Sequence, residues 1–179
     1  MVLRMQMAGA VVGVVLSGVA MAQAPASAAT GPASEAQRGY AAVKGNILKS
    51  ADRMPAGDFQ FKPTPDVRTF ARVVNHITEA QLRSCGAANH TGAPGMAKMP
   101  AETADKAAVV EALKASFAEC DKAYASLTDA NLTEIFDAFG AKRSRVGLMW
   151  GNVAHDSEQY ATLALYLRLK GLAPPSSEK

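Results

Sequence analysis

Two histidines carry the clearest chemical signal in this sequence. The chain contains three histidines, and His76 and His155 are the two that fall in segments with helical periodicity. Asn152 lies three residues before His155 and Gln159 four residues after it, so the three side chains share one face of a helix. That face is otherwise apolar, and a buried polar group without a partner costs about 1–3 kcal/mol. These residues must therefore be hydrogen-bonded, bound to a metal or in contact with a wet pocket.

Two imidazoles on facing helices can hold Zn²⁺, Ni²⁺ or Mn²⁺ and leave coordination positions open for water or substrate. The segment around His76 adds two further polar groups, Asn75 and Glu79. Periodicity alone is weak evidence for a metal site, because a helical histidine is more often a hydrogen-bonded core or surface residue. A hydrogen-bonded polar core is therefore the competing interpretation.

The elements that must position these residues are helices. The 3.6-residue period predicts four of them, at about 34–53, 64–85, 105–127 and 145–171, and no β alternation or hairpin signal interrupts the pattern. The last segment has two apolar faces, so several neighbours should pack around it. We expect an all-α four-helix bundle in which residues 86–103 form a long connection between the second and third helices.

Helix starts can also be read from the sequence. Ser34 to Gln37 has the pattern of a capping box, which predicts the start of the first helix. Thr64, Pro65 and Asp66 combine a capping residue, a first-turn proline and an acid near the positive helix end. The second helix is therefore expected to begin there.

The N-terminus has the three parts of a secretory signal peptide. Arg4 precedes an uncharged apolar run that ends near small residues at Ala20 and Ala22. The run spans about 15 residues, whereas a membrane-spanning helix needs roughly 20. We expect residues 1–22 to be cleaved, 23–33 to form a flexible linker and 34–179 to form the domain. The mature protein would be periplasmic or secreted, with no stable membrane anchor.

Charge excludes some partner classes. Removing Arg4 from the 19 basic residues leaves 18 against 16 acidic residues, a balance of +2. The sequence has no run of five like charges and no basic stripe with interleaved aromatics, so nucleic acid is not an expected partner. A small ligand or a metal ion is the expected partner, and a homodimer is compatible with the sequence.

Export changes how the two cysteines are interpreted, because disulfides persist outside the cytosol. Pairing of Cys85 with Cys120 would stabilise the fold by roughly 4 kcal/mol on the chain-entropy model. Two free buried thiols are the alternative. One cysteine on each of two helices leaves the distance between them open.

Four segments together resemble the DinB-like superfamily, most closely its exported bacterial members. They read FKPTPDVRTF at 61–70, NHITEAQ at 75–81, HDSEQY at 155–160 and YLRLKGLAPPSS at 166–177. The resemblance covers nearly all of the expected mature chain. It implies a four-helix bundle with a long crossover connection and, in many members, a divalent metal bound by three histidines.

The family's ligand pattern matches this sequence at two positions of three. One histidine lies on the second helix and two lie four residues apart on the fourth, which assigns ligand roles to His76 and His155 by resemblance. The third position is Gln159, where the family pattern has histidine. A neutral amide is a poorer zinc or nickel ligand than imidazole. A third ligand could instead be Glu79 or Glu158. His90 is also possible, but it belongs to no family motif.

Two functions are compatible with these observations. The favoured one is a metal-binding or small-ligand-binding bundle with a partly degenerate histidine site. The alternative, implied by other members of the superfamily, is a metal-dependent transferase or hydrolase that uses a thiol. A binding or catalytic site requires an open pocket at the imidazoles, whereas a structural core would close over them.

Overall fold

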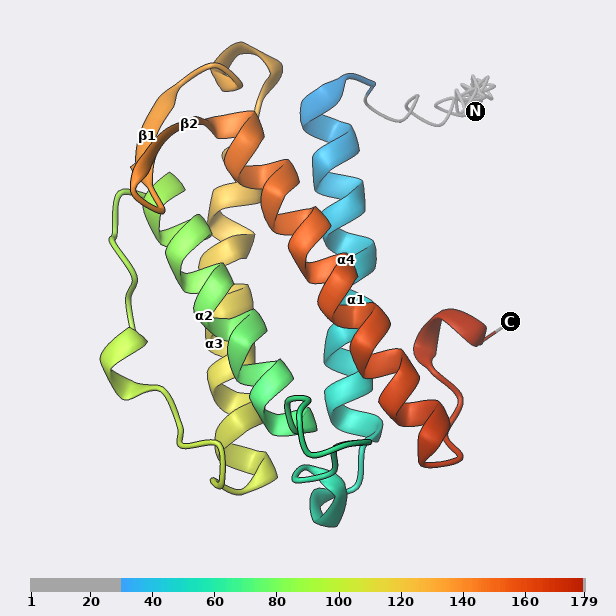
Figure 1. Cartoon of the computed structure of the whole chain (residues 1–179). Helices are drawn as coiled ribbons and strands as arrows, with labels where there is room; N and C mark the ends of the chain where they lie inside the picture. The colour runs from blue at the N-terminus through green and yellow to red at the C-terminus, as the bar shows by residue number, and fades with distance from the viewer. Residues whose placement is uncertain (1–29, 179) are drawn as a thin grey trace, which may run out of the picture.

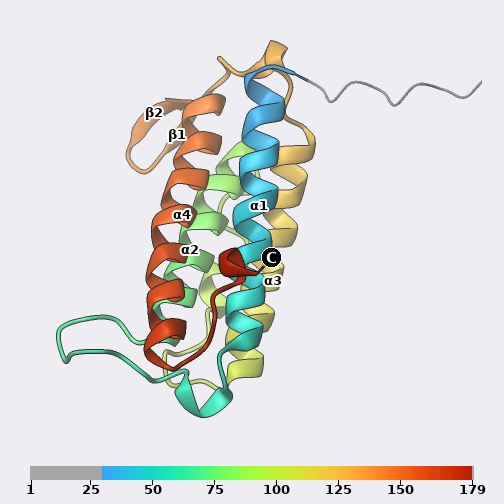
Figure 2. The same ribbon diagram turned by 90° about the vertical axis from the view of Figure 1, so that its right-hand side faces the viewer.

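The computed structural model describes residues 30–178, and four long helices make up most of this part of the chain. They are α1 (Pro32–Arg53), α2 (Phe70–Ala88), α3 (Lys106–Ala125) and α4 (Arg145–Leu169). Figures 1 and 2 show the four side by side in one bundle. The four-helix bundle expected from the sequence is confirmed. The expected signal peptide and most of the expected linker lie outside the described residues.

Helix direction follows from one long connection. In Figure 1, α1 and α4 run one way along the bundle and α2 and α3 run the other way. After α2 the chain returns along the bundle through the short helix η2 (Met96–Lys98) before α3 begins. The crossover expected between the second and third helices is therefore present. It makes α2 an antiparallel neighbour of α4 and a parallel neighbour of α3.

Apolar side chains from all four helices meet in a single core. Tyr40 of α1 stacks on Tyr124 of α3, with ring centroids 3.9 Å apart and planes at 5°. Within the described part of the chain, no helix combines the length and the apolar character needed to cross a membrane.

One small hairpin interrupts the helices at a place where the sequence indicated no strand. β1 (Ile135–Ala138) pairs antiparallel with β2 (Ala141–Ser144). The two turn residues, Phe139 and Gly140, have φ values of 54° and 73°, the left-handed backbone that a two-residue hairpin turn needs. The hairpin was missed because its strands have only four residues each and its turn lacks an Asn-Gly or Asp-Gly pair.

Two helix starts also differ from the sequence prediction. α1 begins before Ser34, so the expected capping box is not its cap. α2 begins at Phe70, where the side chain of Thr69 accepts a hydrogen bond from the backbone N–H of Arg72 at 3.1 Å. Thr69 therefore does the capping that the sequence assigned to Thr64, and the intervening residues form turns.

Candidate metal and ligand site

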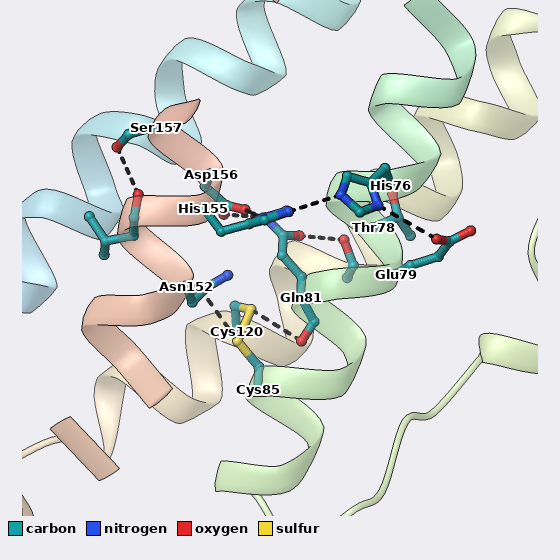
Figure 3. A network of polar contacts seen from close by, with 12 residues as sticks. His76, Thr78, Glu79, Gln81, Cys85, Cys120, Asn152, His155, Asp156 and Ser157 are labelled. Atoms are coloured by element: carbon teal, nitrogen blue, oxygen red, sulfur yellow. Dashed lines mark hydrogen bonds and ion pairs between the residues drawn. A yellow bond between two sulfur atoms is a disulfide. The ribbon is translucent and has the colours of Figure 1, made fainter. Parts of the chain in front are cut away.

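His76 of α2 and His155 of α4 point toward one another across the gap between their helices (Figure 3). Their Nε2 atoms are 3.2 Å apart, and the ring planes meet at 67°. Each residue lies well inside its helix, so rigid backbone holds both rings. The two side chains are 28% and 26% exposed, so both remain accessible from solvent.

A carboxylate lies behind each imidazole. Asp156 Oδ1 is 3.3 Å from His155 Nδ1, and Glu79 Oε2 is 3.9 Å from His76 Nδ1. An ionised carboxylate only accepts hydrogen bonds, so it favours the tautomer with the proton on Nδ1 and the lone pair on Nε2. The two Nε2 atoms are within hydrogen-bond distance of each other, and with both rings in this tautomer their lone pairs would face the same point. A cation at that point would bind both nitrogens and remove their mutual repulsion.

The spacing of the two nitrogens suits ligands of one ion. At a tetrahedral zinc ion with zinc–nitrogen bonds of about 2.0–2.1 Å, two ligand nitrogens lie about 3.3 Å apart. Metal-binding histidines also commonly donate their other ring N–H to a carboxylate. Among residues 30–178, however, no group of three or more His, Cys, Asp or Glu side chains is placed to hold an ion. The imidazoles therefore provide a fitting but partial set of donors.

Asp156 anchors the site in the core. Its side chain is fully buried, and burial raises the pKa of its carboxyl, an effect that the contacts with His155 and Gln81 oppose. Gln81 Nε2 donates to Asp156 Oδ2 at 2.9 Å, and Ser116 Oγ donates to Gln81 Oε1 at 2.5 Å. The network joins α4, α2 and α3, and it holds the carboxylate in place behind the His155 ring.

Arginines surround the other imidazole. Arg72 binds Glu79 through two hydrogen bonds of 3.0 and 3.2 Å. Burial lowers the pKa of His76, and the positive charges of Arg68, His155 and Arg72 lower it further against the opposing effect of Glu79. His76 is thereby favoured in its neutral form, the form in which imidazole binds a metal.

An open cavity of about 350 Å³ adjoins the two imidazoles. Its walls come from α2, α4 and the hairpin, and they include Ala80, Arg83, Phe139, Arg143, Leu148 and Gly151 in addition to His76, Glu79 and His155. Side chains therefore do not close over the histidines. This arrangement fits a binding or catalytic site better than a sealed polar core.

The other candidate ligands predicted from the sequence differ in where the structure places them relative to the two imidazoles. Gln159 is buried one turn beyond His155, but it does not line the cavity. Glu158 is exposed, and His90 is 71% exposed beside Glu134 at 3.6 Å, with its ring against the hairpin. Glu79 faces Nδ1 of His76, the nitrogen turned away from His155, which suits an orienting role more than that of a third ligand.

Three residues at the site were not predicted from the sequence: Asp156, Arg83 and Arg143. Asp156 was within the quoted motif but had no assigned role. Arg83 follows His76 by seven residues, two helical turns, and this spacing was an available signal that both lie on one face. Nothing in the sequence indicated Arg143, which reaches the cavity from the unexpected hairpin.

The cysteines are paired. Cys85 of α2 and Cys120 of α3 form a disulfide with their Cα atoms 4.9 Å apart, which decides between the two alternatives that the sequence left open. The bond is buried next to the site, since Cys85 Sγ lies 3.9 Å from Asn152 Oδ1. The same oxygen accepts a hydrogen bond from the Tyr124 hydroxyl at 3.0 Å.

Comparison with known families agrees with this architecture. The family model of the DinB superfamily matches residues 40–163, which is well over half of the chain. The chain belongs to the DinB superfamily. Proteins of this superfamily often bind metal. The resemblance to the DinB-like superfamily is thereby confirmed.

Three solved structures show the same fold at low sequence identity. A DinB-like protein from Bacillus cereus is 17% identical with a TM-score of 0.63, over 78% of this chain and 93% of that one. A DinB-like protein from Bacillus subtilis is 16% identical with a TM-score of 0.61, over 76% and 92%. A conserved protein from Enterococcus faecalis is 13% identical with a TM-score of 0.63, over 79% and 98%. A search of curated proteins gives no significant match.

Proposed function

We propose that this DinB-superfamily protein binds a divalent metal ion between His76 and His155 and a small ligand in the adjoining cavity. The observation that carries the proposal is the pair of Nε2 atoms facing each other at 3.2 Å, with a carboxylate behind each ring. Imidazole suits Zn²⁺, Ni²⁺ and Mn²⁺ to different degrees. A bound ion would act as a Lewis acid and lower the pKa of a thiol or water next to it.

Two imidazoles bind an ion less tightly than three. Further donors would come from the amide oxygen of Gln159, from solvent or from the ligand itself. Gln159 does not line the cavity, so we expect its contribution to require a change of rotamer. Weak binding that the ligand strengthens is the expected behaviour.

The direct test is elemental analysis of protein purified without a His tag, followed by melting curves with and without Zn²⁺ or Ni²⁺. We expect metal to raise the melting temperature of the wild type, and expect His76→Ala and His155→Ala to abolish that rise. His90→Ala is the matched control, because it removes the third histidine of the chain from an exposed position. A metal response that survives in both site variants would refute the proposal.

The enzyme alternative gains support from the open cavity, since a substrate could reach the imidazoles. In that case the protein would be a metal-dependent transferase or hydrolase that uses a thiol. Its test is the consumption of a low-molecular-weight thiol in the presence of a chromogenic electrophile. Zn²⁺-loaded wild type should react faster than His155→Ala under the same conditions, and equal rates would exclude this alternative.

Export is part of the proposal. The buried disulfide between Cys85 and Cys120 is typical of proteins outside the cytosol and agrees with the secretory signal expected from residues 1–22. We expect mature protein from the periplasm to begin at or near Gln23. Intact mass or N-terminal sequencing that reveals a retained apolar segment would contradict this.

A further inference from the structure

The cavity beside the histidines carries two arginines without counter-charges. Arg83 of α2 and Arg143 of β2 both line it. Neither guanidinium forms an ion pair or hydrogen bond with another residue in the range 30–178, and the Cζ atom of Arg143 lies 5.9 Å from the centroid of the Phe139 ring. Two such guanidinium groups on one cavity leave ten N–H donors free for an anion.

The carboxylate in the cavity lining does not neutralise the two arginines. Glu79 is the one carboxylate in its lining, and Arg72 already binds both of its oxygens, at 3.0 and 3.2 Å. The positive charges of Arg83 and Arg143 are therefore not neutralised by the lining, and the cavity as a whole is positive.

The remaining walls are mostly apolar or small, with Ser84 and Asn152 as their uncharged polar members. Phe139 of the hairpin turn is 53% exposed and lines the cavity, and the nearly buried Leu148 of α4 lines it as well. Gly151 is one turn before His155 on α4, and a Cβ added there would meet no atom within 4 Å. A side chain at Gly151 would therefore extend into the cavity, so this glycine keeps the space open.

We infer that the cavity binds a small organic carboxylate with an apolar body, held at its carboxylate by Arg83 and Arg143 and at its body by Phe139 and Leu148. The planar guanidinium fork matches a carboxylate with two parallel hydrogen bonds. At about 350 Å³ the cavity is near the lower end of the roughly 300–1,000 Å³ range of small-molecule sites. The inference refines the ligand of the proposed function, but the arginine contacts do not require the ion.

Benzoate and its neutral analogue benzamide provide a matched pair of probes for calorimetry on the mature wild-type protein. We expect benzoate to bind and benzamide to bind at least about tenfold more weakly, because the charge-assisted hydrogen bonds are lost. Arg83→Gln and Arg143→Gln should each weaken benzoate binding by about tenfold or more. Lys142→Gln is the matched control: it removes a charge from the same hairpin at a residue outside the lining, and it should leave binding unchanged.

A blocking variant tests the position of the ligand independently of charge. Gly151→Leu replaces a glycine inside a helix by a good helix former, so its melting temperature should not fall. Because the new side chain occupies the cavity, benzoate binding should be lost. Retained benzoate binding in folded Gly151→Leu would place the ligand elsewhere and overturn the inference.

Two further arms separate this inference from the metal proposal. Benzoate binding that persists without metal and in His155→Ala, but is lost in both arginine variants, supports the carboxylate site even if the metal proposal fails. Binding that is lost in His155→Ala and unchanged in both arginine variants overturns the inference and leaves the metal proposal standing. Inorganic phosphate that displaces benzoate at equal concentration would also overturn it, since the apolar walls would then contribute nothing.

Discussion

Helix α2 has two sides that differ in how completely their polar groups are satisfied. Toward α3 it is closed by the buried Cys85–Cys120 disulfide and by the hydrogen bond between Gln81 and Ser116. Toward α4 and the hairpin it is open, with two facing imidazoles and an arginine that has no counter-charge in the cavity. The closed side holds the helix in place, which allows the open side to keep groups unsatisfied for a ligand.

Removing the disulfide should have the largest effect on stability and a small effect on the site. The bond joins residues 35 apart in sequence, so Cys85→Ala combined with Cys120→Ala should lower the free energy of unfolding by about 4 kcal/mol. Urea denaturation measures this change, and reduced wild type should behave alike. The melting response to Zn²⁺ should persist while the protein is folded. Unchanged stability would mean that the closed side does not depend on the bond.

Completing the histidine set should strengthen the open side. Gln159→His places two imidazoles four residues apart on α4, the spacing at which two histidines on one helix share a metal. At a hundredfold excess over the dissociation constant, the metal should then stabilise the fold by about 2.7 kcal/mol, more than in wild type. Melting curves with and without Zn²⁺ or Ni²⁺ measure the difference. A response no larger than that of wild type would show that residue 159 cannot turn toward the histidines.

Asp156 connects the two sides, so its removal should affect both. Asp156→Ala leaves the Gln81 amide and the His155 ring N–H without a partner, which should lower the free energy of unfolding by about 2 kcal/mol. Metal affinity should fall by about 10–100-fold, because an orienting partner of a ligand is lost. Ser157→Ala is the control on the next, exposed position. Loss of stability without loss of metal affinity would limit Asp156 to the core.

The smallest expected effect concerns a second group of hydrogen bonds on the closed side, those of Glu119. Burial tends to raise the pKa of Glu119, but hydrogen bonds from Thr91, Asn89 and Lys122 outweigh it and the net pKa lies below its ordinary value of 4.5. A lowered pKa means that the unfolded chain takes up the proton first, so this stabilisation is present above pH 4.5 and is lost as pH falls through the folded pKa.

Glu119→Gln should therefore lower the free energy of unfolding by about 1 kcal/mol at neutral pH, and the difference from wild type should shrink in acid. Denaturation curves at neutral and acidic pH measure this. A difference that stays constant with pH would show that hydrogen-bond geometry, and not charge, makes the contribution.

Much of the architecture could be predicted from the sequence because helical burial is periodic. Apolar residues at spacings of three and four predicted all four helices, the long connection after α2 and the inward position of Cys120. Helix periodicity singled out His76 and His155, and the family resemblance assigned them ligand roles. Such patterns depend only on residues that are close together in the sequence, so they can be recognised without knowing how the helices pack.

Other features were decided by tertiary structure alone. The distance between Cys85 and Cys120 depends on the parallel packing of α2 and α3, which spacing in the chain does not specify. Thr69 could replace Thr64 as the cap because either residue satisfies the same local rule. The pairing of Arg83 with Arg143 in one cavity needs both the antiparallel packing of α2 on α4 and the short hairpin with its Phe139-Gly140 turn. Residues 60 apart in the chain come together only when the helices pack into the bundle. For that reason the lining of the ligand cavity could not be predicted from the periodicity of the sequence.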